Sequence, residues 1–278
     1  MKLIIGICLA LAAVAGAVVL NFREDEFNYS NYPQGRLSNG YTIESTDAPY
    51  IVSLSVSSIN YAHFCAGSII SKDWILTAAH CLQDLKELGG DVIGMAVYAG
   101  LRNRTHLDEA QVRHTDFAFA HKKFTGQEGS DDIALLHVSP SFEINARVKP
   151  VVLPTMNEEY VGESKTYGWG LRQVEESKYE KQLQMGVADV LNATECRAAL
   201  PSDAPVNKRH VCVRVAACHG DGGTPLVVER VGGVSELIGI GSYGYMPCGY
   251  RGLPTVYSAV ANYVDWIAQV EWAYYILH

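Results

Sequence analysis

Three separated segments carry residue types that could do chemistry together. The first, Leu76–Cys81, holds His80; the second, Asp131–Leu136, places Asp132 before an apolar run; the third, Ala217–Leu226, is glycine-rich. Taken singly, a histidine beside a cysteine is usually structural, and an aspartate or glycine pair usually marks a turn. An acid, an imidazole and a hydroxyl held together support nucleophilic catalysis, because the acid orients the imidazole and the imidazole takes the hydroxyl proton. The order and flanks of the three segments make this chemistry the interpretation to test.

The set resembles the chymotrypsin-like serine protease family, in which histidine, aspartate and serine occur in this order along the chain. The resemblance extends from Arg36 to the C-terminal segment. It implies that Asp132 orients His80 and that His80 acts as the general base. The wide gap between Cys81 and Cys196 is typical of invertebrate members.

The third segment departs from the family at the nucleophile. The family reads Gly-Asp-Ser-Gly-Gly-Pro, whereas residues 220–225 read Gly-Asp-Gly-Gly-Thr-Pro, so Gly222 stands at the nucleophile position. Thr224 lies two residues further along, and a displacement of that size is too large for productive attack. The amides of Gly220 and Gly222 still match the family's oxyanion hole. We therefore predict a non-catalytic serine protease homologue.

The same resemblance assigns a specificity pocket. Ala216 would form its base, so no buried carboxylate is present to pair with a lysine or arginine side chain. Ser242 and Gly244 match the strand that holds the substrate backbone, and Thr255 stands where larger pockets have glycine. We expect the pocket to favour small or modest apolar side chains.

An activation site is also implied. Arg36 and Leu37 match the family's cleavage site, which requires an activating protease. Asp221 would then accept the new amino terminus of Leu37. Ser38 replaces the usual apolar second residue, which weakens this insertion.

The chain carries features of secretion. Lys2 precedes an apolar run that ends at Val14, and Ala15–Ala17 is a small-residue cleavage site, so residues 1–17 are predicted to be a signal peptide. The apolar run is too short to span a membrane comfortably. Asn28, Asn103 and Asn192 each begin an N-x-[ST] sequon for glycosylation. We expect an extracellular protein.

Cysteine usage agrees with that compartment. Six cysteines follow the signal peptide, and an even number in a secreted chain indicates disulfides, with 15 connectivities open on arithmetic alone. No C-x-x-C pair is present, which argues against a zinc site. The family resemblance implies the pairs Cys65–Cys81, Cys196–Cys212 and Cys218–Cys248.

Charge excludes one class of partner. The 278 residues include 22 basic and 30 acidic side chains, a net charge of −8, so the chain has no electrostatic reason to bind nucleic acid or anionic lipid. No carboxylate cluster implies a metal, and we expect no cofactor and a monomer.

Short alternating runs separated by glycine turns predict an all-β fold. The runs are Ile51–Ser57, Ser68–Ile75, Val92–Tyr98, Ile133–Val138, Val187–Val190, Pro225–Glu229 and Glu236–Ser242. Spacing of Tyr263, Ile267, Val270 and Tyr274 predicts an amphipathic C-terminal helix, with Asp265 and Glu271 on other faces.

The family resemblance implies two packed six-stranded antiparallel β-barrels with that helix at the C-terminus. The expected domains are a propeptide at 18–36, an N-terminal barrel at 37–148, a C-terminal barrel at 149–261 and the helix at 262–278.

Three functions follow from this sequence. The first is a secreted, inactive homologue that binds a peptide or protein ligand in the former substrate groove, as a cofactor, decoy or regulator of extracellular proteolysis. The second is an active serine-type endopeptidase with small or apolar specificity, which the retention of His80 and Asp132 keeps open. The third is a carrier for small apolar ligands.

Overall fold

The computed structural model describes residues 41–56, 62–87, 89–126, 131–171, 179–246, 248–249 and 252–278. The predicted signal peptide, propeptide and activation site, including Arg36, Leu37, Ser38 and Asn28, lie outside this part. The strands are β1 Tyr41–Thr42, β2 Ile51–Val56, β3 Ala62–Ile69, β4 Trp74–Thr77, β5 Ala96–Ala99, β6 Gln111–Ala120, β7 Ala134–Ser139, β8 Gly162–Gly168, β9 Gln184–Leu191, β10 His210–Val213, β11 Pro225–Arg230, β12 Val234–Tyr243 and β13 Thr255–Ala259. The helices are α1 Ala79–Glu87, α2 Ala193–Ala199 and α3 Val264–Leu277, with short 3₁₀ turns at Leu107–Glu109 and Val260–Asn262.

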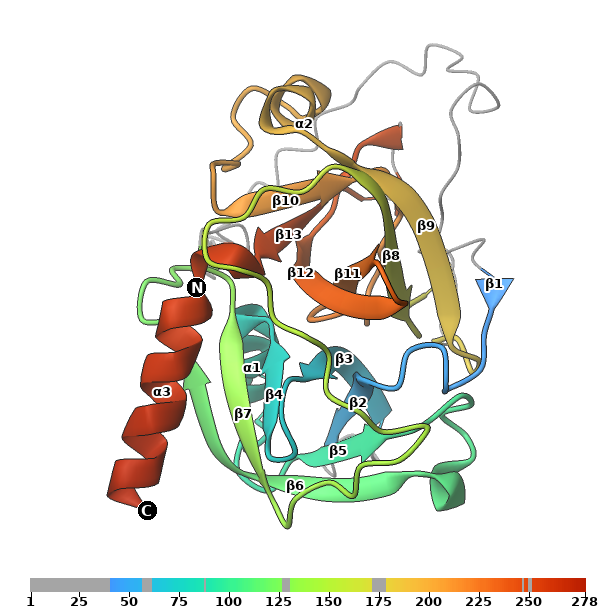
Figure 1. The fold of residues 1–278 in the computed structure, drawn as a ribbon, viewed down its shortest axis with the longest axis vertical. Coiled ribbons are helices and arrows are strands. Elements are labelled where there is room, and N and C mark those ends of the chain that lie inside the picture. The colour runs from blue at the N-terminus through green and yellow to red at the C-terminus, as the bar shows by residue number, and fades with distance from the viewer. Residues whose placement is uncertain are drawn as a thin grey trace, which may run out of the picture.

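Strands β2 to β7 form the first barrel, closed in the order β2-β3-β4-β7-β6-β5 with all neighbours antiparallel (Figure 1). Every side chain of β4 is buried, because residues on its outer face are covered too, as Trp74 is by Tyr274 of α3. The register shifts at Leu54/Ser55 in β2 and Thr115/Phe117 in β6. Such bulges bend strands and help a sheet to close.

The second barrel lies beside the first and contains β8 to β13. Its strands pair in the ring β8-β9-β10-β13-β12-β11, and β11 pairs with β8 to close it. The short β1 joins this barrel through β9, although it precedes the first barrel in the chain (Figure 1). The fold is therefore two six-stranded antiparallel barrels with a C-terminal helix, which confirms the predicted fold class.

The predicted strand Ser68–Ile75 is two strands. Ser71 accepts hydrogen bonds at its hydroxyl from the amides of Asp73 (3.3 Å) and Trp74 (3.2 Å), and this turn separates β3 from β4. Apolar residues lie on both sides of this tight turn, so the hydropathy pattern does not show it. Only the serine marks the point where the chain reverses.

Strands β6, β8, β10 and β13 were not among the predicted runs. β8 reads Gly-Glu-Ser-Lys-Thr-Tyr-Gly and buries Ser164 and Thr166. Ser164 donates to the Ala188 carbonyl (2.6 Å), and Thr166 accepts from the Tyr257 hydroxyl (3.2 Å). Its buried polar groups are satisfied by neighbouring strands, so polarity here does not indicate a loop.

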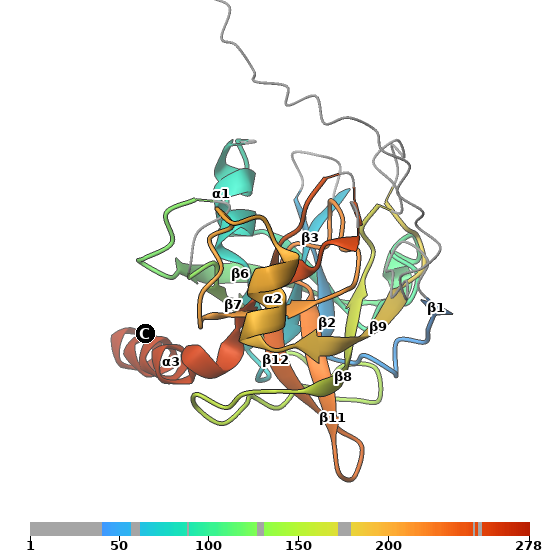
Figure 2. The same ribbon diagram turned by 90° about the horizontal axis from the view of Figure 1, so that it is seen from above.

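The C-terminal helix is confirmed, and α3 runs along the first barrel (Figures 1 and 2). Tyr263 and Ile267 are buried, and Val270 and Tyr274 pack against the core, as the spacing predicted. Tyr274 meets the Trp74 ring edge-on at a centroid distance of 5.2 Å. In the described part of the chain, no helix is long and apolar enough to cross a membrane.

All three disulfides implied by the family resemblance are formed. They join Cys65 in β3 to Cys81 in α1, Cys196 in α2 to Cys212 in β10, and Cys218 to Cys248. The first ties the strand beside the candidate site to the helix that carries His80.

Candidate active site between the two barrels

His80 and Asp132 meet at the edge of the first barrel. His80 is the second residue of α1, and Asp132 precedes β7. The Asp132 carboxylate accepts one hydrogen bond from the His80 amide (2.9 Å) and another from His80 Nδ1 (2.8 Å). Because a carboxylate only accepts, Nδ1 carries a proton, and Nε2 is left facing the second barrel.

A hydroxyl from the second barrel completes this arrangement. Ser242, at the end of β12, donates to Asp132 Oδ2 at 2.6 Å. The aspartate is fully buried and holds three hydrogen bonds. Burial acts to lower the pKa of His80, but the charge of Asp132 and its hydrogen bond outweigh burial and raise that pKa. Ser242 therefore hydrogen-bonds directly to Asp132, and it also lies on the strand predicted to hold the substrate backbone.

Gly222 occupies the position that faces the imidazole. A Cβ built on Gly222 would lie inside van der Waals distance of His80 Nε2 and 3.1 Å from Cys65 Sγ. A side chain at residue 222 therefore points at the base. The structure brings His80, Asp132 and Gly222 together as the sequence predicted, and the third position carries no hydroxyl.

Thr224 is turned away from His80. Its side chain is fully buried, and its hydroxyl donates to the Asp221 carbonyl at 2.8 Å. The β12 residue Gly241 donates its amide to the Thr224 carbonyl at 2.9 Å, which fixes the backbone here. The hydroxyl of Thr224 thus supports the loop from within.

Asp221 belongs to the same loop, and its side chain is buried. Its carboxyl accepts hydrogen bonds from the amides of Gly170 (2.9 Å) and Cys218 (3.0 Å). Burial raises the pKa of Asp221 to about 7, although those two hydrogen bonds act to lower it. Among the residues that the structure describes, no cation pairs with it. Its predicted partner, the amino group of Leu37, lies outside them.

His63 holds the other side of this loop, and sequence reasoning missed it. Its Nε2 donates to the Gly220 carbonyl (2.9 Å), so its Nδ1 accepts from the Ser53 hydroxyl (2.8 Å). Burial lowers the pKa of His63 to about 3, which keeps the ring neutral. His63 and Gly220 are 157 residues apart, and no local signal connects them.

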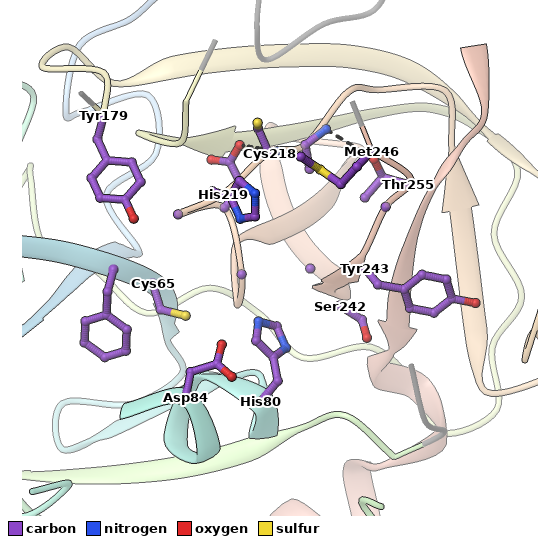
Figure 3. Close-up of a pocket in the computed structure, with 17 residues that line it drawn as sticks. Cys65, His80, Asp84, Tyr179, Cys218, His219, Ser242, Tyr243, Met246 and Thr255 are labelled. Carbon is purple, nitrogen blue, oxygen red and sulfur yellow. Dashed lines mark hydrogen bonds between the residues drawn. The ribbon is translucent and has the colours of Figure 1, made fainter. Parts of the chain in front are cut away.

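The cleft between the barrels has a volume of about 460 Å³ (Figure 3). His80 and Asp84 lie on one side of it, and Ser242, Tyr243 and Met246 on another (Figure 3). Gly220 and Gly222 also line it. The imidazole of His80 points into the opening.

The residues predicted for the specificity pocket lie in or beside this cleft. Ala216 is buried and does not line the cleft, whereas its neighbour Ala217 does. Thr255 and Gly244 line it as predicted. The Thr255 hydroxyl bonds to the Val215 carbonyl and accepts from the Ala217 amide (3.2 Å).

Two predicted glycosylation positions are described. Asn192 is exposed and caps α2, where its Oδ1 accepts from the Glu195 amide at 2.9 Å. Asn103 Oδ1 accepts from the amide (2.9 Å) and hydroxyl (2.7 Å) of Thr105. In both asparagines these hydrogen bonds use Oδ1, so the side-chain nitrogen takes no part in them.

In the described ranges, one group of side chains brings possible metal ligands together: Cys65, His80 and Cys81. The two cysteines form a disulfide, so their sulfurs are not available as thiolates. We assign no metal to this group.

Comparison with known proteins agrees with this geometry. Residues 37–267 match the trypsin family. The chain is 34% identical to lectizyme of Glossina austeni, over 96% of each sequence. It is also 32% identical to trypsin II-P29 of Gallus gallus, over 86% of this chain and 90% of that protein, and 32% identical to trypsin of Sus scrofa, over 84% and 95%. With the two barrels, the three disulfides and the His80–Asp132 pair, these matches establish that the chain belongs to the trypsin family of serine proteases.

Proposed function

We propose that this protein is a secreted serine protease homologue that binds a peptide or protein segment without cleaving it. The observation that carries the proposal is Gly222, which faces His80 Nε2 with no side chain. In a comparable triad, loss of the nucleophile lowers turnover by about a million-fold. Catalysis therefore stops at the first step, while the cleft remains.

No serine or threonine hydroxyl in the described lining of the cleft takes the place of the missing serine. Ser242 donates to Asp132, and the Thr255 hydroxyl is bonded to the Val215 carbonyl. Thr224 donates to the Asp221 carbonyl. Each of these hydroxyls is committed to a partner other than His80. The alternative of an active endopeptidase rests on the intact Asp132–His80 pair alone.

The ligand side chain that this cleft favours is small or modest and apolar. Ala217, Gly244 and Thr255 line the pocket, and Met246 borders it. In the described lining no carboxylate stands at the pocket base to attract lysine or arginine. The protein partner would present an alanine- or valine-sized residue here.

Secretion and activation complete the proposal. Disulfides suit an oxidising compartment, and residues 1–17 read as a signal peptide. Cleavage after Arg36 by another protease would free the amino group of Leu37, and the buried carboxyl of Asp221 is the group to receive it. The intact mass of the secreted chain tells whether it begins at Leu37.

The test compares turnover of a peptide library by the Arg36-cleaved protein and its Gly222→Ser variant. A serine Cβ lies too close to His80 Nε2 in the present geometry, so the imidazole must withdraw slightly before Oγ can bond to it. We expect no turnover by the natural protein and measurable turnover by Gly222→Ser.

The matched control is Gly222→Ser with His80→Ala, which restores the hydroxyl without the base and is expected to be silent. Turnover by the natural protein, together with covalent labelling by a serine-directed probe, would make the endopeptidase alternative correct. Silence from Gly222→Ser would mean that the cleft no longer assembles a working site.

A further inference from the structure

We propose that the cleft recognises the free C-terminal carboxylate of a peptide rather than an internal peptide bond. This inference rests on the proposed function and names its ligand class: the carboxyl ends that proteases release. Three hydrogen-bond donors converge beside an apolar pocket, one from His80 and two from the Gly220–Gly222 backbone. Together they match the two oxygens of a carboxylate.

The first donor is the imidazole of His80. Its Nδ1 is bonded to Asp132, and its Nε2 faces the empty side of Gly222. In the described residues, the polar contact of Nε2 is with the Cys81 sulfur at 3.7 Å, which is a weak acceptor. The charge of Asp132 raises the pKa of His80 against the effect of burial, and this favours the protonated ring. In an active relative, a serine hydroxyl would occupy this place.

The second and third donors are the amides of Gly220 and Gly222. Both residues line the cleft, and neither amide donates to an acceptor in the described part of the protein. The loop that presents them is held on both sides. His63 holds the Gly220 carbonyl, and the Asp221 amide donates to the Cys218 carbonyl at 2.9 Å. Backbone amides that such a turn leaves without an acceptor can form an anion site.

A carboxylate uses these donors better than an internal peptide carbonyl does. The peptide carbonyl has one oxygen, which would satisfy the amides and leave His80 Nε2 without a partner. A carboxylate has two oxygens, so one accepts from the amides and the other from the imidazolium. Hydrogen bonds between charged groups are roughly twice as strong as neutral ones.

The surrounding charges permit one anion here. Asp132 is already paired with His80, and Asp221, which also lines the cleft, is buried and accepts hydrogen bonds from the amides of Gly170 and Cys218. Asp84 lines the cleft on the α1 side. His219 lies exposed on the Gly220 side and adds a second imidazole at the rim.

The pocket beside the donors sets the last residue of the peptide. Ala217, Gly244 and Thr255 limit it to a small apolar side chain. The ligand is therefore a peptide that ends in a residue such as alanine or valine with a free carboxylate.

The experiment uses two libraries of acetylated hexapeptides that end in alanine or valine, one as free acids and one as carboxamides. Peptides retained by the Arg36-cleaved protein are identified by mass spectrometry, and each is then measured as an acid–amide pair by fluorescence anisotropy. We expect the acid to bind at least about tenfold more tightly. The preference should fall below about threefold in His80→Gln, which has no positive charge.

The control variant is His106→Gln, since His106 is exposed on a loop outside the cleft, and it should keep the full preference. Equal affinity of acids and amides would overturn this inference and leave the proposed function standing. An acid preference that survives His80→Gln would also overturn it. Failure of both libraries to bind would instead count against the proposed function.

Discussion

Burial shifts the pKa values of two side chains beside Gly222 in opposite directions, in each case toward the uncharged form. His63 has its pKa lowered by burial to about 3, and Asp221 has its pKa raised by burial to about 7. His63 bonds to the Gly220 carbonyl and the Ser53 hydroxyl, and Asp221 accepts from the amides of Gly170 and Cys218. The two side chains therefore affect the pH dependence of the unfolding free energy with opposite signs. Substituting one of them at a time separates the two effects.

The uncut chain should lose stability through Asp221 as the pH rises from about 4 to about 7. In the unfolded chain the carboxyl ionises near its ordinary pKa of 3.8, whereas the folded one keeps its proton to about 7. In that window the folded state holds one more proton, so raising the pH favours unfolding. His63 has the opposite sign, because its folded pKa lies below the 6.5 that is ordinary for histidine.

The measurement is the difference in unfolding free energy between the natural chain and Asp221→Asn across this pH range. We expect the difference to change by a few kcal/mol between about pH 4 and 7 and to stay constant above. The matched control is Asp203→Asn, an exposed acid, which should leave the natural pH profile unchanged. A flat difference for Asp221→Asn would contradict the burial of a neutral acid.

Among the helices and strands, those with a clear local pattern of apolar residues could be predicted from the sequence. The alternating runs gave β2, β7, β11 and β12, and the spacing of Tyr263 and Ile267 gave α3. The polar β8 was missed because its serine and threonine are satisfied by residues of β9 and β13, which lie further along the chain. From the order of the motifs we could predict that His80, Asp132 and Gly222 lie together. The His63–Gly220 contact could not be predicted in this way, because it depends on how the barrels pack.

The loop after Gly222 approaches the first barrel so closely that only glycine fits. Gly223 has a φ of +76°, and a Cβ there would overlap the Ala66 carbonyl and the Thr77 hydroxyl. Gly233 has a similar φ of +73° with nothing within 4 Å of a Cβ. Substituting these two glycines therefore separates the stability cost of steric overlap from the cost of backbone strain.

Gly223→Ala should therefore destabilise the protein by more than about 3 kcal/mol, whereas Gly233→Ala should cost about 1 kcal/mol from backbone strain alone. Chemical denaturation of both variants beside the natural chain measures the two values. Similar losses in the two variants would mean that the loop can move away from Ala66, and the close approach would then be wrong.

For the whole molecule, the site exists only where the two barrels meet. The first barrel supplies His80 and Asp132, and the second supplies Gly222 and Ser242. The barrels are joined here by the Ala66 amide on the Gly222 carbonyl (2.8 Å) and by Ser242 on Asp132. In this assembly Gly222 faces His80 with no side chain, so a bound peptide is expected to remain whole.

The most direct measurement is native mass spectrometry of the Arg36-cleaved protein after long incubation with a peptide selected from the alanine- and valine-ended libraries. We expect a complex whose mass equals that of the protein plus the intact peptide, with no fragments in solution. Peptide fragments, or a protein mass increased by a covalently attached fragment, would contradict it, because either requires a nucleophile that Gly222 does not provide.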